Sequence, residues 1–438
     1  MKRSCHNYIL SCFFLIIIYR IYLNSWDYKF NNKIHDIISD LETISQVASD
    51  YNIFLYVFQE GILNSLIKSN LRSDGSVIYD MPILLAVDSK YFKGIDYNEF
   101  LTRLRTALFM TYAAYNHGSP IANEIGENCV VGFVLQRTAV VYLLILYPRE
   151  DFWWYGNLQN DQKFHSKLKI LNSSQNNTWR ILTQEGALDK FQGTLMKING
   201  IYRNYLYPRN IIKFIKNIKH SKFIECNHTN ARIFKNRYKS ETSVKARRFR
   251  HQSRKLLFKT KVVLDNLSIP FWLSSGTCLG YLRQCDIISY SQDVDIGVFV
   301  KDFNYQIIAD MHAHHLYLKH WFGELEDSLE LSFVDQQSTL KLDIFFFYVE
   351  GDTYWNGGTQ VKTGKKFKYV FEKFYLCWTS FLGLKVRVPC DTKTYILANY
   401  GPNWTIPIRQ WDWKSSPSNV KFNGYWPPGK WPIVIRTW

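Results

Sequence analysis

Hydrophobic positions along the chain predict a membrane anchor followed by two α/β domains. Residues 8–23 are almost continuously apolar and follow the basic residues Lys2 and Arg3. Because no small-residue cleavage pattern follows, we interpret this segment as an uncleaved signal-anchor helix, with residues 1–7 as a cytosolic tail and the remainder in a lumen. A cleaved signal peptide and a buried core helix are the alternatives.

The segment after the anchor is expected to form a stem and a first domain. Residues 24–70 are assigned to the stem, which should be helical from about Lys33 to Asn70. Apolar runs then predict buried strands at residues 83–88, 129–135 and 139–146, with a helix over 97–115. This alternation predicts an amino-terminal α/β domain over residues 71–212, in which we find no catalytic constellation.

A basic connector and a second domain complete the expected organisation, which belongs to the α/β (α+β) class. The connector and a helix from Ser243 to Leu267 occupy residues 213–268, and the second domain occupies residues 269–438. There the pattern predicts a short strand at 271–274, a helix through residues 275–283, and strands at 293–300 and 340–348.

Charge changes this picture mainly within the connector. The 438 residues are 47% hydrophobic, a composition that excludes the disordered and low-complexity classes. The net charge of +17 favours an anionic partner or surface. Sixteen Lys and Arg residues lie between Lys213 and Lys261, against Glu225 and Glu241. We interpret the stretch as a solvated or membrane-facing connector, with polyanion binding as the alternative.

The cysteines and sequons are compatible with a lumenal protein. Of eight cysteines, six lie beyond the anchor region, and they could pair as disulfides in a connectivity that the sequence does not specify. No C-x-x-C spacing occurs, which argues against a structural zinc site. Five N-x-S/T sequons permit lumenal glycosylation without requiring it.

Three aspartates carry the candidate chemistry. Asp293 and Asp295 are two residues apart on a predicted strand, so their side chains share one face and can converge on one hard divalent cation. Asp343 is isolated in an apolar strand, where a carboxylate is costly unless it is paired or bound to metal. Taken alone, a D-x-D pair at a strand end is more often a turn cap or a solvated pair than a metal site.

The order of these features resembles the nucleotidyltransferase fold of DNA polymerase β and its relatives. A strand is followed by the small-residue turn Ser275-Gly276-Thr277, which opens a helix; the D-x-D strand and the strand of Asp343 come next. The resemblance implies a mixed sheet, a turn whose backbone N–H groups cradle nucleotide phosphates, and three carboxylates that hold two Mg²⁺ or Mn²⁺ ions.

Longer runs are similar to the fukutin and LicD family of that fold. They are residues 273–280, 290–297, 322–333 and 355–369, and the match continues through 399–401 and 411–413. The similarity is dense over about residues 270–430 and looser in the amino-terminal part. The basic stretch at 232–254 and the short anchor depart from the family pattern.

This resemblance implies a specific reaction. The expected protein is a single-pass type II Golgi membrane enzyme with a lumenal catalytic domain, a transferase of substituted phosphate groups. It would move ribitol 5-phosphate from CDP-ribitol to the GalNAc of the phosphorylated O-mannosyl glycan of α-dystroglycan, and would release CMP. The implied partners are that glycan, other O-mannosyl glycan transferases and the Golgi membrane, but no nucleic acid; a homo-oligomer stays open.

Roles for individual residues follow from the same resemblance. Asp293 and Asp295 are assigned to the metal-diphosphate complex, and Asp343 to the second metal and the acceptor proton. Ser275, Gly276 and Thr277 would hold phosphate oxygens. Two further assignments each have an alternative. Arg283 would bind phosphate or form a surface ion pair. The basic loop with Lys362, Lys365 and Lys366 would close over CDP or the glycan, or it would be an exposed hairpin tip.

Two other functions stay open at this stage. One is a nucleotidyltransferase that acts on nucleic acid, which the fold and the basic stretch would allow but the anchor opposes. The other is a non-catalytic scaffold for O-mannosyl glycan transferases, which the three intact carboxylates oppose. The residues themselves do not distinguish CDP-ribitol from CDP-choline or CDP-glycerol as donor.

Overall fold

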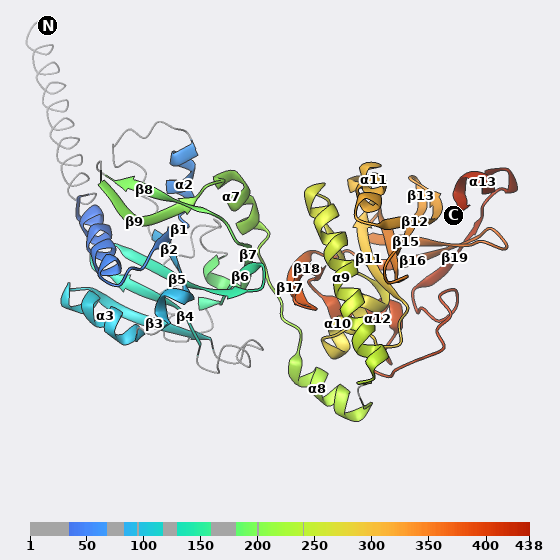
Figure 1. Ribbon diagram of the computed structural model, residues 1–438, viewed down its shortest axis with the longest axis horizontal. Helices are drawn as coiled ribbons and strands as arrows, with labels where there is room; N and C mark the ends of the chain where they lie inside the picture. The colour runs from blue at the N-terminus through green and yellow to red at the C-terminus, as the bar shows by residue number, and fades with distance from the viewer. Residues whose placement is uncertain are drawn as a thin grey trace, which may run out of the picture. The chain divides into compact units, whose positions relative to one another are not determined.

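The chain forms two compact units, Met1–His220 and Ser221–Trp438. Figure 1 shows the computed structural model, which describes residues 35–67, 83–93, 96–116, 129–158, 181–198, 201–239 and 241–438. The predicted cytosolic tail and signal anchor, residues 1–23, lie outside the described residues. Among the described helices, none combines the length and the apolar composition that a membrane span requires.

The first unit is built on a sheet with helices packed against it. Within its described residues the sheet has nine strands, seven of them in the order β3-β4-β5-β2-β1-β9-β8, while β6 pairs with β5 and β7. The strands are β1 (Leu55–Val57), β2 (Ile83–Asp88), β3 (Met110–Asn116), β4 (Cys129–Gln136), β5 (Val140–Arg149), β6 (Phe152–Tyr155), β7 (Gly186–Asp189), β8 (Gly193–Ile198) and β9 (Ile201–Pro208). The helices are residues 35–50, α2 (Glu60–Ile67), α3 (Tyr97–Thr106) and α7 (Ile211–Lys219), with a short 3₁₀ turn at Ser89–Phe92.

The single helical stem predicted over residues 33–70 is wrong. The chain leaves its first helix at residue 50, and Asn52 takes a positive φ of 55°. The apolar residues of β1 then enter the sheet between β2 and β9 and are fully buried there. Sheet pairing therefore overrides helical propensity in this segment, and Asp40 ties the first helix to the same sheet by accepting a hydrogen bond from Arg137 Nε at 2.6 Å.

The helix predicted over residues 97–115 is also shorter than expected. It ends at Thr106, Leu108 has a φ of 65°, and the chain continues as β3 against β4. The alternating sequence of β3 suits a strand, and its pairing with β4 decides the outcome. The buried strands predicted near residues 83, 129 and 139 are confirmed as β2, β4 and β5.

The second unit contains a mixed sheet and the helices that cover it. Within its described residues the main path is β19-β16-β15-β14-β13-β12-β20, and β11 pairs with both β14 and β10. The strands are β10 (Phe271–Leu273), β11 (Asp293–Phe299), β12 (Leu316–Glu324), β13 (Asp327–Asp335), β14 (Lys341–Glu350), β15 (Thr353–Gln360), β16 (Lys365–Glu372), β17 (Leu376–Phe381), β18 (Leu384–Pro389), β19 (Val420–Tyr425) and β20 (Ile435–Thr437). The helices are α8 (His228–Arg237), α9 (Val244–Asn266), α10 (Ser275–Gln284), α11 (Gln306–Ala313), α12 (Thr392–Tyr400) and α13 (Trp431–Val434).

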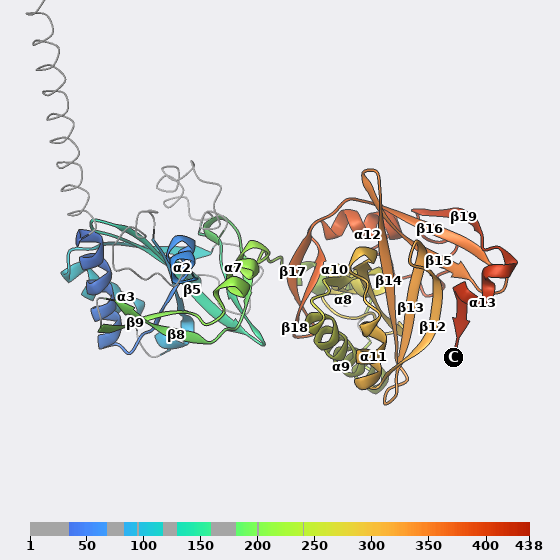
Figure 2. The ribbon, with the colours of Figure 1, turned by 90° about the horizontal axis from the view of Figure 1, so that it is seen from above.

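Strand β14 is the centre of this second sheet. Its first half lies between β11, to which it is parallel, and β13, to which it is antiparallel, while its second half pairs with β15. Helices α9, α10 and α11 gather on one face of these strands (Figure 2). The predicted strands and helices of residues 243–348 are confirmed to within a few residues.

The basic stretch is divided between the two units instead of forming one connector. Its first residues belong to α7 of the first unit, whereas α9 packs in the second unit with Leu256, Leu257 and Leu264 buried. Polar groups fix α9 as well, because Lys259 Nζ lies 2.6 Å from Asp335 Oδ1 and Arg254 Nε donates to the Leu382 carbonyl at 3.0 Å. Lys259 and Arg254 therefore contribute to the packing of the second unit.

Two disulfides settle the pairing that the sequence left open. Cys226 pairs with Cys285, which joins the segment before α8 to the end of α10, and Cys377 pairs with Cys390 across β17 and β18. Cys129 and Cys278 are buried free thiols.

The contact between α9 and Asp335 generates a stability prediction. Asp335→Ala should lower the free energy of unfolding by about 2 kcal/mol, because it leaves the Lys259 ammonium and the Ser338 N–H without their shared acceptor. Calorimetry of the full chain measures this loss. Asp352→Ala is the control, because Asp352 is fully exposed, and it should unfold like the parent protein.

The same carboxylate predicts a pH dependence. Burial alone would raise the pKa of Asp335, but hydrogen bonds from Lys259 and Ser338 outweigh burial and hold the pKa below its ordinary value. A lowered pKa contributes stability above the unfolded pKa of about 3.9, and that contribution disappears as the pH falls through the folded pKa. The difference between Asp335→Ala and the parent should therefore shrink below about pH 4. A difference that stays constant to pH 2 would show that the charge of Asp335 is irrelevant.

Candidate metal and phosphate site

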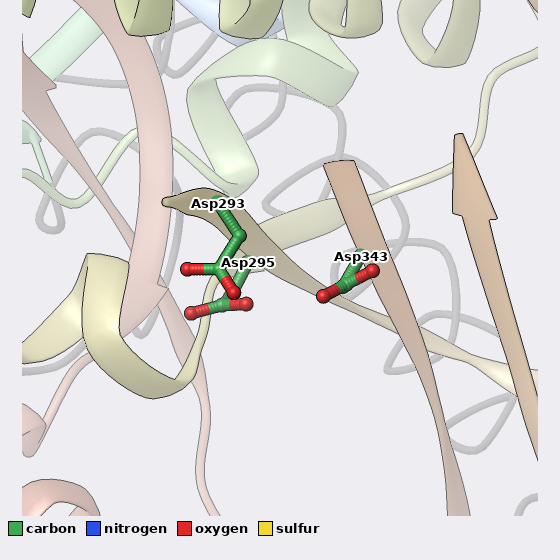
Figure 3. A group of neighbouring side chains, drawn as sticks. All are labelled: Asp293, Asp295 and Asp343. Carbon is green, nitrogen blue, oxygen red and sulfur yellow. The ribbon is translucent and has the colours of Figure 1, made fainter. Parts of the chain in front are cut away.

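Two neighbouring parallel strands bring the three aspartates together. In the register between β11 and β14, Asp295 lies opposite Asp343. Asp293 stands two residues before Asp295, so its side chain lies on the same face of β11. One carboxylate oxygen from each residue lies within 4.8 Å of the others, and Figure 3 shows the side chains turned toward a shared space. Val294 and Ile296 are buried on the opposite face, as the alternation predicted.

A separate hydrogen bond orients each carboxylate. Ser291 Oγ donates to Asp293 Oδ1 at 2.7 Å, and Ser332 Oγ donates from β13 to Asp343 Oδ1 at 2.6 Å. The Gly276 N–H donates to Asp295 Oδ2 at 3.0 Å from the first turn of α10. The site therefore combines side chains from β11, β13 and β14 with the amino-terminal end of a helix, where backbone N–H groups favour negative charge.

Lys341 is a member of the site that the sequence reasoning missed. Its Nζ lies 2.7 Å from Asp343 Oδ2 and 3.9 Å from Asp293 Oδ2. Burial would lower the pKa of Lys341, but the adjacent carboxylates outweigh burial and raise it. The signal was available, since Lys341 stands two residues before Asp343 and so shares its face of β14.

The carboxylates repel one another despite this lysine. Burial and the neighbouring charges of Asp293 and Asp343 raise the pKa of Asp295 well above its ordinary value, and burial raises the pKa of Asp343. Glu330, on β13, has its pKa raised to about 8 by burial and by Asp343. A divalent cation would relieve this repulsion, and an all-oxygen donor set without Cys or His suits Mg²⁺ or Mn²⁺. The residues present therefore fit the implied metal.

The turn at the start of α10 divides into two parts. Ser275, with a φ of 40°, and Gly276 line the pocket beside the aspartates. Thr277 is only 1% exposed, and its Oγ1 accepts a hydrogen bond from the Asp295 N–H at 2.8 Å. Thr277 thus positions β11 from beneath, while Ser275 and Gly276 are placed where a phosphate could contact them.

The pocket in front of the aspartates has a volume of about 980 Å³. Its other walls are β15, the following turn and residues 399–417, where the rings of Tyr400 and Trp411 lie 4.7 Å apart. Lys362 is among the lining residues, whereas Lys365 and Lys366 are not. Lys365 Nζ lies 5.9 Å from the Tyr425 ring and Lys366 pairs with Asp327, so these two lysines make contacts along the sheet instead.

Arg283 lies at the far end of α10 and faces the same pocket. It is 4% exposed, its guanidinium lies 4.8 Å from the Phe234 ring, and Nη2 donates to Gln284 Oε1 at 3.1 Å. Within the described residues no carboxylate lies within salt-bridge distance of it, so the surface ion pair considered from the sequence is not formed. Burial lowers the pKa of the guanidinium below its ordinary value.

This arrangement suits phosphoryl chemistry. Converging carboxylates can hold a divalent cation, the adjacent helix end and Arg283 offer donors to phosphate oxygens, and the pocket is large enough for a nucleotide-sized donor. The chemistry of the site thus points to transfer of a phosphate-linked group.

Comparison with known proteins agrees with this geometry. The family described as LicD/FKTN/FKRP, nucleotidyltransferase domain, matches residues 268–391, which include all three aspartates. The family described as fukutin N-terminal matches residues 123–254. The matched regions thus span parts of both units.

Individual relatives point the same way. The Homo sapiens protein named ribitol-5-phosphate transferase FKTN is 45% identical over 300 residues, and the Mus musculus protein of that name is 46% identical over 304 residues; each match covers 68% of this chain and 63% of the relative. An uncharacterized protein of Caenorhabditis elegans is 29% identical over 247 residues, 53% of this chain and 61% of that one. The match therefore spans less than two thirds of the length of the named relatives. Residues 268–391 therefore match the LicD/FKTN/FKRP nucleotidyltransferase domain, and the chain is similar to fukutin over parts of both units.

Proposed function

We propose that this protein transfers ribitol 5-phosphate from CDP-ribitol to a glycan hydroxyl and releases CMP. The observation that carries the proposal is the convergence of Asp293, Asp295 and Asp343 beside the start of α10, within the region matched by the nucleotidyltransferase family. The names of the mammalian relatives support ribitol 5-phosphate as the transferred group.

The residues divide the work of this reaction. Asp293, Asp295 and Asp343 would hold one or two Mg²⁺ or Mn²⁺ ions, which neutralise the diphosphate and the departing CMP. Ser275 orients the diphosphate at the start of α10, where the Gly276 N–H holds Asp295, and Arg283 contacts the oxygens of a neighbouring phosphate. Asp343, with its pKa raised by burial, accepts the proton of the attacking hydroxyl.

The acceptor and the cellular setting are part of the same proposal. The acceptor is the GalNAc of the phosphorylated O-mannosyl glycan on α-dystroglycan, and the walls of Tyr400 and Trp411 offer flat faces beside the reacting centre. The protein acts as a type II membrane protein of the Golgi, near other O-mannosyl glycan transferases. Two disulfides in the second unit support an oxidising compartment and oppose a cytosolic or nuclear enzyme of nucleic acid.

The direct test is CMP release by the full chain. CDP-ribitol, a phosphorylated O-mannosyl glycopeptide that ends in GalNAc, and Mg²⁺ or Mn²⁺ should give CMP only when all three are present. Asp295→Asn should lower the rate about a thousandfold, because several kcal/mol of charge stabilisation are lost with the ligand. Asp352→Asn, in an exposed turn, should retain the parent rate. Undiminished activity of Asp295→Asn would remove the aspartates from catalysis, and no release with either metal would favour the scaffold.

Lys341 yields a second prediction about the same site. Its ammonium occupies the position beside the carboxylates that a metal cation would take. Lys341→Met should therefore bind Mn²⁺ about tenfold more tightly in the absence of donor. Without metal, the variant should unfold at a lower temperature, because the carboxylates lose their cationic partner. Titration calorimetry with Mn²⁺ and thermal unfolding with and without the metal measure both effects. Lys319→Met, on β12 of the same sheet, is the control, because that lysine contacts the carboxyl-terminal residue instead. Weaker Mn²⁺ binding by Lys341→Met would contradict competition between lysine and metal.

A further inference from the structure

A second cleft opens at the opposite end of α10 from Gly276. It has a volume of about 530 Å³ and is lined by α8, the start of α9 and the segment after α10; we call it the α8–α9 cleft. Helix α8 packs directly on α10 (Figure 1). Arg283, Tyr290 and Arg409 line both this cleft and the aspartate pocket, so the two hollows share a wall.

The α8–α9 cleft has a strong excess of positive charge. Its cationic side chains outnumber its carboxylates, Glu241 and Asp286, by a wide margin; they are Lys235, Lys239, Arg247, Arg250, Arg283 and Arg409.

Both carboxylates of the cleft are already engaged. Arg250 Nε donates to the two Asp286 oxygens at 2.8 and 2.9 Å, and Glu241 accepts from Ser243 and Ser289 at 3.1 and 3.2 Å. In the described part of the chain, neither Lys235 nor Lys239 has an acidic partner. These two lysines are therefore available to an anionic ligand.

Arg283 strengthens the case for an anion. A buried guanidinium without a counter-charge is unfavourable, because its lost hydration is not replaced by a paired carboxylate. Arg283 is 4% exposed, and within the described residues its guanidinium contacts the Gln284 amide, the Phe234 ring and the Tyr290 side chain but no carboxylate. An anion at the junction of the two hollows would supply the missing charge, and a phosphate matches the forked geometry of arginine.

The position of the cleft indicates which substrate brings the anion. Gly276 and Gln284 are eight residues apart on α10, which corresponds to about 12 Å along the helix axis. CDP-ribitol carries its charge in the diphosphate, which the aspartates and the start of α10 would hold. A second anion at the other end of α10 therefore belongs to the acceptor.

We propose that the α8–α9 cleft binds a phosphate ester of the acceptor glycan while the donor diphosphate occupies the aspartate site. This assignment rests on the proposed function, since it presupposes an acceptor and a donor bound side by side in the two adjoining hollows. Lys235, Lys239 and Arg283 hold the ester, and the distance between the two anion sites sets which hydroxyl of the glycan reaches the donor. The cleft thus acts as a specificity site rather than a catalytic one.

The test compares two acceptors and two matched double variants. The acceptors are the phosphorylated O-mannosyl glycopeptide and the same glycopeptide without its phosphate. Lys235→Gln/Lys239→Gln removes two charges from the cleft, whereas Lys245→Gln/Arg248→Gln removes two exposed charges of α9 outside it. CMP release gives KM and kcat for each pair of protein and acceptor, and calorimetry gives the affinity for each glycopeptide without turnover.

The parent protein should prefer the phosphorylated acceptor, and Lys235→Gln/Lys239→Gln should raise its KM about tenfold while the KM for CDP-ribitol and kcat stay unchanged. The unphosphorylated acceptor and the control variant should show no change. An equal effect on both acceptors, an effect on the KM for CDP-ribitol, or no effect would overturn the proposal. Absence of CMP release by the parent would instead refute the proposed function, and the calorimetric comparison would still decide whether the cleft recognises the phosphate.

Discussion

Repulsion among three converging carboxylates, two of them buried, is the constraint on which the second unit depends. Asp293, Asp295 and Asp343 share a space in which burial and the neighbouring like charges raise the pKa of Asp295 well above its ordinary value. The surrounding groups each offset part of that cost: Lys341 by its charge, and Ser332 and the Gly276 N–H by hydrogen bonds. Because a divalent cation would relieve the remaining repulsion, the folded chain should bind such a cation at these carboxylates.

The scaffold maintains this arrangement through strand register. Asp295 faces Asp343 only in the observed alignment of β11 with β14, and a slip of one residue would turn each carboxylate to the opposite face. Thr277 fixes β11 against α10, and β13 places Ser332 opposite Asp343. The same helix connects the two hollows, because α10 starts at the aspartates and ends at Arg283 beside the α8–α9 cleft. The elements that form the fold of the second unit therefore also position the side chains of the site.

The sequence predicted the cluster of three aspartates better than its surroundings. The two-residue spacing of Asp293 and Asp295 and the isolation of Asp343 are local features, so strand alternation was enough to place them. The same alternation could have placed Lys341, which stands two residues before Asp343, whereas the burial of Arg283 required the docking of α8, which a single sequence does not specify. The stem helix failed because sheet pairing of β1 outweighed local propensity. The disulfide partners lie up to 59 residues apart, and only the fold brings them together.

Anomalous X-ray diffraction from crystals of the full chain soaked with Mn²⁺ and CDP tests the central claim most directly. The account predicts a manganese peak between Asp293, Asp295 and Asp343, with the diphosphate of CDP in contact with that metal and with the start of α10. Parallel crystals of Asp295→Asn should lose the peak. A parent structure in which CDP binds without manganese at these aspartates, or in which manganese binds only elsewhere, would contradict the account.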